Sequence, residues 1–249
     1  MSPVLTPLPI LILYPHSRCN CRCVMCDIWK IETAEEMSAA ELERHMADIV
    51  RLRVEWIVFS GGEPLMHSDL FRLASLVRSR GMRTTLLSTG LLFSRYAGQI
   101  VASIDDVIVS LDGPPAVHDA IRRVPGAFTL MAAGVEALHS RRPGYPVAAR
   151  STVQRGNFRN LRETVLAARE MHLQSVSFLA ADVTSEAFNR PGGWPPEREA
   201  TVAPAIEELP ALEAEIEALI LEECGRGFVL ETPEKLRRIV RHFRAHHGL

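Results

Sequence analysis

Four of the five cysteines of this chain stand within eight residues, at positions 19, 21, 23 and 26. Cys19, Cys23 and Cys26 form the spacing C-x3-C-x2-C. Three thiolates on one short loop can ligate three irons of a cubane iron–sulfur cluster, and the fourth iron then has no protein ligand. Because that iron can bind a small molecule, the spacing indicates a reactive centre. In a reducing compartment, such a group is typical of metal binding rather than of disulfides.

A structural zinc site is the alternative interpretation of these cysteines. Cys21 can supply a fourth sulfur, or His16 a nitrogen. Structural zinc needs four ligands in a tetrahedron, and four cysteines packed into eight residues are poor geometry for it. The spacing therefore favours the cluster, with Cys21 as a bystander or as a spare ligand after oxidative damage.

A second motif lies further along the chain, where Gly61, Gly62, Glu63 and Pro64 follow an apolar run. Glycines let a ligand's ammonium group approach the carbonyls at a strand end, where a side chain would block it. Glu63 adds negative charge nearby. Two adjacent glycines alone are also typical of a tight turn.

The elements that must position these motifs are short apolar runs alternating with amphipathic stretches. The runs predict strands at 10–14, 56–59, 83–87, 106–111, 147–153 and 175–179. Strand and helix in alternation predict right-handed βαβ units and a parallel sheet. Either an open doubly wound sheet or a partial barrel fits this periodicity.

Helix starts are marked by capping residues. Ser38 and Glu41 form a capping box. Ser68 is expected to cap the next helix, and Thr232 precedes Pro233 at the start of the last one.

Length and composition exclude several classes of protein. The chain has 249 residues, of which 47% are hydrophobic, which is ample for a packed core. Its 28 basic and 30 acidic side chains argue against nucleic-acid binding by bulk charge. The apolar stretch near the N-terminus is too short to span a bilayer and lacks the features of a secretory signal. We expect a cytoplasmic protein without a membrane partner.

On these two motifs the sequence resembles the radical S-adenosylmethionine (radical SAM) enzymes. Their hallmarks are C-x3-C-x2-C after the first strand and Gly-Gly-Glu-Pro at the end of the second. Met25 stands where the family has an aromatic or bulky residue. The stretch from Ser110 to Gly113 is similar to the Ser-x-Asp-Gly of the branch that includes peptide maturases. The core also resembles that of the molybdopterin-biosynthesis member, and His118, Asp119 and Arg122 match the family's His-Asp-x-x-Arg.

The resemblance implies an α/β fold, a partial (β/α)6 barrel of parallel strands with the cluster at its C-terminal mouth. It implies one core domain over 1–249 with a loop insertion at about 182–204. That loop holds Trp194, expected to help shape the substrate pocket, although a solvent loop or linker fits equally. Many relatives carry a cysteine-rich C-terminal extension for auxiliary clusters. We therefore expect either a minimal enzyme or one whose extension is absent from this chain.

The resemblance also implies roles for individual residues. Cys19, Cys23 and Cys26 are the expected iron ligands. The expected cofactor contacts are Met25, Gly61, Gly62, Glu63, Ser88, Ser110 and Leu179. Asn157 fits a motif near adenine or a helix cap, and Arg150 can reach a carboxylate or phosphate or form a strand-end salt bridge.

The implied activity is reductive cleavage of S-adenosylmethionine at a [4Fe-4S] cluster. The resulting 5′-deoxyadenosyl radical abstracts hydrogen from a peptide or small-molecule substrate. A flavodoxin- or ferredoxin-type electron donor is the expected partner, and nucleic acid is not. A non-catalytic iron–sulfur redox or electron-transfer protein is the alternative, but Gly-Gly-Glu-Pro would then have no purpose.

Overall fold

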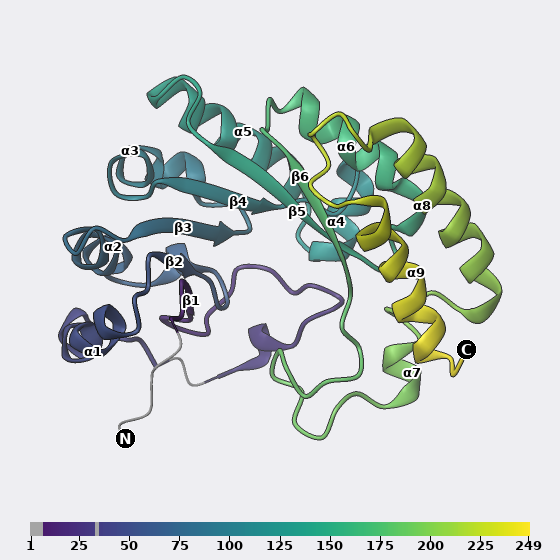
Figure 1. The fold of residues 1–249 in the computed structure, drawn as a ribbon, viewed down its shortest axis with the longest axis horizontal. Coiled ribbons are helices and arrows are strands. Elements are labelled where there is room, and N and C mark those ends of the chain that lie inside the picture. The colour runs from purple at the N-terminus through teal and green to yellow at the C-terminus, as the bar shows by residue number, and fades with distance from the viewer. Residues whose placement is uncertain (1–6, 33–34) are drawn as a thin grey trace.

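The computed structural model describes residues 7–32 and 35–249. Over those residues six parallel strands pair in chain order, from β1 at one edge to β6 at the other. The strands are β1 Ile10–Leu13, β2 Trp56–Phe59, β3 Arg83–Ser88, β4 Asp106–Ser110, β5 Val147–Val153 and β6 Val176–Ala180. The sheet curls into a half-barrel, so the expected partial (β/α)6 barrel is confirmed (Figure 1). Its strands match the predicted ranges to within one residue at each end.

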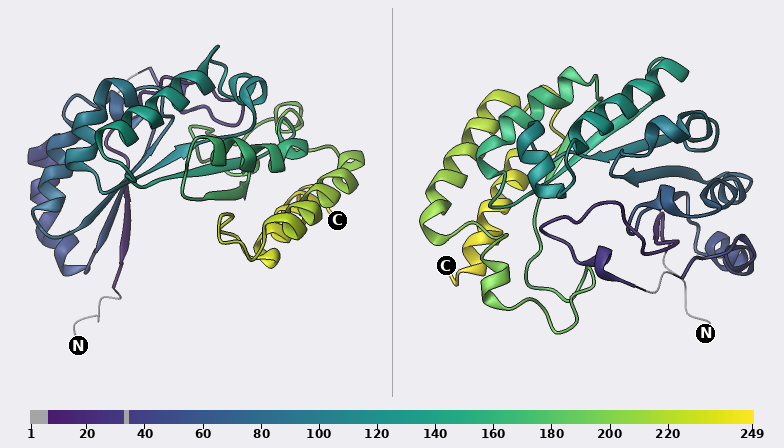
Figure 2. Two further views of the ribbon diagram at one scale, coloured as in Figure 1. Left: turned by 90° about the horizontal axis from the view of Figure 1, so that it is seen from above. Right: turned by 180° about the vertical axis from the view of Figure 1, so that it is seen from behind.

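Helices cover the outer face of this sheet (Figure 2). The crossover helices are α1 Ala39–Arg51, α2 Leu70–Arg78, α3 Phe93–Ser103, α4 Pro115–Arg122, α5 Ala127–Arg141 and α6 Leu161–Glu170. Beyond β6 come α7 Pro196–Glu199, α8 Leu209–Glu223 and α9 Pro233–His246. Single 3-10 turns are η1 Ile28–Lys30, η2 Pro64–Met66, η3 Phe158–Asn160 and η4 Ile206–Glu208. Helices α8 and α9 pack together at the β6 side of the sheet (Figure 1).

Local capping explains where several helices begin. The capping box of Ser38 and Glu41 starts α1, and the Thr232 side chain accepts from Lys235 N–H at the start of α9. The expected cap at Ser68 is wrong. Asp69 occupies the N-cap of α2 without a side-chain bond, because the Ser68 hydroxyl donates instead to Glu36 on the preceding loop.

The two faces of the sheet differ in burial. Ile57 and Phe59 of β2 are fully buried in the core under the helices. Ile10 and Ile12 of β1 are 43% and 59% exposed, and they alternate with Leu11, which packs against the core. Since alternate residues of a strand face opposite sides, the concave face of the half-barrel is open and partly apolar.

The edge of the sheet at β6 is covered by the chain that follows α8. Val176 N–H donates to Phe228 C=O over 2.9 Å, and Leu230 N–H donates to Val176 C=O over 3.1 Å. Phe178 N–H donates to the Glu231 carboxylate over 3.0 Å. Unpaired backbone groups at this edge therefore find partners within the chain.

Among residues 7–32 and 35–249, no helix has the length and apolar character needed to cross a bilayer.

Candidate functional site

A loop of residues 14–29, hereafter the cysteine loop, leaves β1 and crosses the mouth of the half-barrel (Figure 1). Its four cysteines and Cys224 are all unpaired thiols. Cys21 is fully buried and Cys23 is 7% exposed, whereas Cys19 and Cys26 are half-buried. The three predicted iron ligands therefore share one loop at the carboxyl ends of the strands, and Cys21 lies inside the protein.

The backbone of the cysteine loop is fastened to the end of α4. Arg22 N–H donates to Arg122 C=O over 3.1 Å, and Val24 N–H donates to Ile121 C=O over 3.0 Å. These two bonds flank Cys23 and set its position. The Thr89 hydroxyl oxygen, directly after β3, lies 3.1 Å from the side-chain amide of Asn20.

The two glycines after β2 lie directly against the cysteine loop. A Cβ atom on Gly61, whose φ is +118°, would lie 2.7 Å from His16 O. On Gly62 it would lie 2.1 Å from Arg18 O. We expected these glycines to leave room for a ligand's ammonium group. In the structure, the space beside their Cα atoms is filled by backbone of the cysteine loop, so they first permit this close packing.

Glu63 is completely buried, and its carboxylate joins its own turn after β2 to the end of β3. It accepts from Ser88 Oγ over 2.8 Å, from Thr89 N–H and Oγ1 over 2.7 Å each, and from Leu65 N–H over 3.1 Å. Burial raises the pKa of Glu63, although these donors oppose the rise. Ser88 and Glu63, both predicted to hold the cofactor, are thus hydrogen-bonded to each other at the end of β3.

His16 links the two motifs through both ring nitrogens. Its Nδ1 accepts from Arg18 N–H over 3.1 Å, so the proton lies on Nε2, which donates to Glu63 C=O over 2.8 Å. Burial lowers the pKa of His16, which favours the neutral ring. Neither nitrogen is free to ligate a metal in this arrangement, which argues against the zinc interpretation with His16 as the fourth ligand.

Arg122 is a buried cation that touches one of the predicted iron ligands. Its Nη1 lies 3.5 Å from Cys23 Sγ, and its Nη2 lies 2.5 Å from the Asp112 carboxylate. The neighbouring Cys21 thiol and the Arg122 guanidinium hold the pKa of Cys23 below its ordinary value, against the effect of burial. Burial raises the pKa of Cys19 to about 12 and that of Cys26 to about 11.

Further predicted residues lie at the ends of β4 and β6 and in the middle of β5. Ser110 and Arg150 are register partners on adjacent strands, so their side chains share one face. Arg150 is exposed and donates to Ser177 Oγ over 3.3 Å. Leu179 is 41% exposed at the end of β6. The parallel topology thus brings Ser110, Leu179 and Ser88 to the same edge as the cysteine loop.

Asn157 is buried and joins the ends of β4 and β5. Its amide donates to Asp112 C=O over 3.0 Å and to Thr152 C=O over 3.1 Å, and its oxygen accepts from Gln154 N–H over 2.8 Å. It makes no side-chain capping bond to the turn that follows, so the cap interpretation is wrong. Its proximity to adenine stays a prediction.

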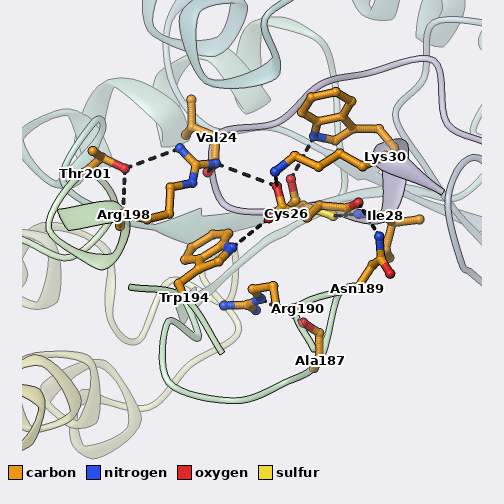
Figure 3. A network of polar contacts seen from close by, with 12 residues as sticks. Val24, Cys26, Ile28, Lys30, Ala187, Asn189, Arg190, Trp194, Arg198 and Thr201 are labelled. Carbon is orange, nitrogen blue, oxygen red and sulfur yellow. Dashed lines mark hydrogen bonds and ion pairs between the residues drawn. The ribbon is translucent and has the colours of Figure 1, made fainter. Parts of the chain in front are cut away.

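The loop of residues 182–204 grips the cysteine loop just after Cys26 (Figure 3). Trp194 Nε1 donates to the Asp27 carboxylate over 2.7 Å, and Arg198 Nη2 donates to Val24 C=O over 2.6 Å. Asp27 N–H donates to Phe188 C=O over 3.1 Å. The loop is therefore neither a free linker nor a solvent loop.

Trp194 is 9% exposed, and its ring lies between two guanidinium groups. The Arg190 and Arg198 groups stand 4.3 and 4.7 Å from its ring centroid. The loop with Trp194 is expected to help shape the substrate pocket, which stays a prediction; the Trp194 ring itself packs against these cations and its N–H faces Asp27. Phe188 and Asn189, on the same loop, line the neighbouring cavity instead.

That cavity has a volume of about 560 Å³ and lies between the cysteine loop, η1, the loop after β2 and the 182–204 loop. This volume is in the range of small-molecule sites, about 300–1,000 Å³. Its lining residues are Tyr14, His16, Ser17, Ile28, Ile31, Glu35, Gly61, Gly62, Phe188 and Asn189. Of the predicted cofactor contacts, the two glycines face it.

The donor set suits a cluster better than a single ion. In the part of the chain that the structure describes, no three His, Cys, Asp or Glu side chains converge on one point as ligands of a single metal. Structural zinc requires such convergence. A cubane cluster places each thiolate on a different iron, so three cysteines of one loop fit it.

Sequence reasoning did not find the roles of His16, Asp27 or the Arg122–Asp112 pair. Their partners lie far along the chain, as with Trp194 and Asp27, which are 167 residues apart. His16 and Asp27 do stand three positions before the first cysteine and one after the last. That adjacency was the available signal.

Comparison with known proteins agrees with this geometry. The family model described as the radical SAM superfamily matches residues 13–166. A pre-heme d1 synthase from Dinoroseobacter shibae is 34% identical over 162 residues, covering 64% of this chain and 40% of that protein. A PqqA peptide cyclase from Xanthomonas campestris pv. campestris is 26% identical over 216 residues, covering 85% of this chain and 54% of that protein. This chain thus spans about half or less of these relatives.

Among solved structures, Streptococcus suis SuiB bound to S-adenosylmethionine superposes with a TM-score of 0.65. The alignment covers 88% of this chain and 49% of SuiB, at 16% identity. At that identity the likeness shows the fold alone.

Proposed function

The chain belongs to the radical SAM superfamily, and on that premise we propose that it is an enzyme that cleaves S-adenosylmethionine reductively at a [4Fe-4S] cluster. The family uses this cluster and this cofactor. Cys19, Cys23 and Cys26 are the proposed cluster ligands. When bound, the cluster and cofactor together supply a 5′-deoxyadenosyl radical that takes a hydrogen atom from the substrate.

One observation carries this proposal. The loop with C-x3-C-x2-C and the Gly-Gly-Glu segment, 42 positions apart from Cys19 to Gly61, are packed backbone against backbone at the mouth of the half-barrel. His16 and Glu63 lock the two segments together. An iron–sulfur protein that only carries electrons needs the cysteines but not this second segment, so the arrangement favours the enzyme.

Individual residues of this chain then have distinct roles in binding the cofactor. Gly61 and Gly62 present backbone to the cavity, where a cofactor amino group can be bound. We propose that the exposed Arg150 guanidinium and the Ser110 hydroxyl hold the cofactor carboxylate, which their position as register partners on β5 and β4 supports. Leu179 offers backbone at the end of β6 for the adenine. The 182–204 loop covers one side of the cysteine loop and excludes water there.

The proposed substrate is a peptide or a small metabolite. The names of the relatives include both a peptide cyclase and a pre-heme d1 synthase. The open concave face presents Ile10, Ile12 and Tyr14, which are 43%, 59% and 59% exposed. Such a face suits the apolar part of a substrate. The proposed electron donor is a flavodoxin- or ferredoxin-type protein.

The experiment is anaerobic. The reconstituted protein is mixed with dithionite and S-adenosylmethionine, and 5′-deoxyadenosine is measured by chromatography. We expect 5′-deoxyadenosine from the wild-type protein and none from the Cys19→Ala, Cys23→Ala, Cys26→Ala triple variant. The matched control is Cys224→Ala, which removes a half-buried thiol outside the cysteine loop.

Two results would contradict the proposal. A reconstituted protein with full iron and sulfide that releases no 5′-deoxyadenosine would support the non-catalytic redox protein instead. Retention of the cluster by the triple variant would show that other residues bind it. The protein is then incubated separately with a peptide and with a porphyrin carboxylate. The substrate class is the one that raises 5′-deoxyadenosine release above the rate without substrate.

A further inference from the structure

Asp112 and Arg122 form an ion pair that is almost entirely inside the protein. The Arg122 side chain is 8% exposed and that of Asp112 is 0% exposed, with Nη2 and Oδ2 2.5 Å apart. Burying two charges is unfavourable unless both are closely paired and hydrogen-bonded. A buried pair of this kind beside a predicted metal ligand therefore calls for a functional reason.

The surroundings hold Asp112 in place. Its Oδ1 accepts from Thr152 N–H over 2.9 Å, its C=O accepts from Asn157 Nδ2 over 3.0 Å, and its N–H donates to His118 Nδ1 over 3.2 Å. These bonds come from β5, from the residue that precedes η3 and from α4. Asp112 is thus a rigid anchor for the guanidinium.

The guanidinium has a second contact, on the sulfur of Cys23. Nη1 lies 3.5 Å from Cys23 Sγ, and Nε has no hydrogen-bond partner among the described residues. The C=O of Arg122 also accepts from Arg22 N–H, next to Cys23. Within the described ranges, Arg122 is the only charged side chain that donates a hydrogen bond to a cysteine sulfur.

We infer that Arg122, oriented by Asp112, is a positioning residue that sets the reduction potential of the cluster through Cys23. The inference rests on the proposed function, because it takes Cys23 as an iron ligand. Hydrogen bonds to ligand sulfur and nearby charge are two of the factors that set the potential of an iron–sulfur cluster. Reduction adds one negative charge, so a cation in contact with a ligand sulfur stabilises the reduced state and raises the potential.

The opposing charge of Asp112 makes a two-sided test possible. Asp112→Asn leaves the cation without its counter-charge, so the potential rises above that of the wild type. Asp112→Asn with Arg122→Gln removes both charges, and since Arg122 is the nearer one, the potential falls below that of the wild type. We expect these two variants to differ at least tenfold in the equilibrium constant for one-electron reduction, which is 59 mV.

The measurement is an anaerobic redox titration of the cluster-loaded proteins followed by EPR. The matched control is Arg123→Gln, which removes an exposed positive charge from the next residue and should leave the potential unchanged. The inference is overturned if the reduction potential of Asp112→Asn does not lie above that of the wild type and that of the double variant below it. A shift of the same size in Arg123→Gln would overturn it too. Iron and sulfide content separates the two failures: a normal cluster with an unmoved potential refutes only Arg122, whereas a wild-type protein without a cluster refutes the proposed ligands and this inference together.

A second measurement does not depend on the folding of variants. Wild-type protein labelled with guanidino-15N arginine should show, by pulsed EPR of the reduced cluster, a 15N coupling of contact range. Its absence would equally overturn the inference.

Discussion

The grip of the 182–204 loop on Asp27 yields a quantitative prediction. Trp194→Phe removes the indole N–H that donates to the Asp27 carboxylate over 2.7 Å. It keeps an aromatic ring between the Arg190 and Arg198 guanidinium groups. The substitution therefore isolates one hydrogen bond on the residue that follows Cys26.

The size of the effect comes from the charge and burial of Asp27. This residue is 5% exposed, and its carboxylate keeps a second partner, Lys30 Nζ, at 2.9 Å. Burial acts to raise the pKa of Asp27, but Lys30 and Trp194 outweigh it and lower the pKa, so the group is ionised at neutral pH. A hydrogen bond to a charged group contributes about 1.5–3 kcal/mol. We expect a loss of about 2 kcal/mol from the closing free energy of this contact.

Native-state hydrogen exchange measures that loss directly. The Asp27 amide donates to Phe188 C=O and is protected only while the two loops are closed. A loss of about 2 kcal/mol makes opening roughly 30-fold more frequent. Mass spectrometry of peptides covering Asp27 and the 182–204 loop, from cluster-loaded protein, should show this acceleration.

The matched control is Trp56→Phe. Trp56 Nε1 donates to the Thr85 hydroxyl over 2.7 Å, within the sheet and far from the 182–204 loop in sequence. This substitution removes an indole N–H whose hydrogen bond has the same length, 2.7 Å, and it leaves the contacts of Asp27 intact. Exchange at Asp27 within threefold of the wild-type rate in Trp194→Phe, or equal acceleration in Trp56→Phe, would refute the reasoning.

Two further predictions concern packing and pH. Gly62→Ala should abolish cluster loading, measured as iron per chain after reconstitution, because its Cβ would meet Arg18 O at 2.1 Å. The control is Gly98→Ala in α3, whose Cβ would meet nothing nearer than 3.9 Å, and this variant should load normally. Burial lowers the pKa of His118 to about 3, from an ordinary value of 6.5, so the unfolded chain binds the proton more readily. The neutral His118 ring therefore makes its full contribution to the free energy of unfolding above pH 6.5. That contribution falls between pH 6.5 and 3 by up to about 1.4 kcal/mol per pH unit. His118→Gln should flatten that slope in urea unfolding at stepped pH, and an unchanged slope would contradict the assignment.

Much of the fold follows from local pattern. The β2 strand occupies the predicted residues 56–59, and Ser38 and Glu41 form the predicted capping box. These elements depend on neighbours within a few positions, which the sequence displays. Helices α3 and α4 were not individually predicted, because Leu92 and Pro114 at their N-caps supply no side-chain hydrogen bond to mark the start.

The features that the sequence did not reveal have a common physical cause in contacts between distant segments. Ser68 fits a helix cap by local rules, but Glu36, 32 residues earlier, takes its hydroxyl. The glycines after β2 pack against the backbone of residues 16–18, which no local rule predicts, and their contact with the cofactor stays a prediction. Trp194 donates its N–H to Asp27, 167 residues away, which no local rule predicts.

The kind of chemistry available to this chain could therefore be predicted from its amino-acid sequence. Three cysteines of fixed spacing and a Gly-Gly-Glu segment, each after an apolar run, indicate the kind of centre because donor type and chain spacing are local properties. Only the folded chain decided what surrounds that centre. Arg122 reaches Cys23 across 99 positions, and Trp194 reaches Asp27 across 167. Such pairings depend on how the curled sheet brings its strand ends together, which no periodicity in the sequence encodes.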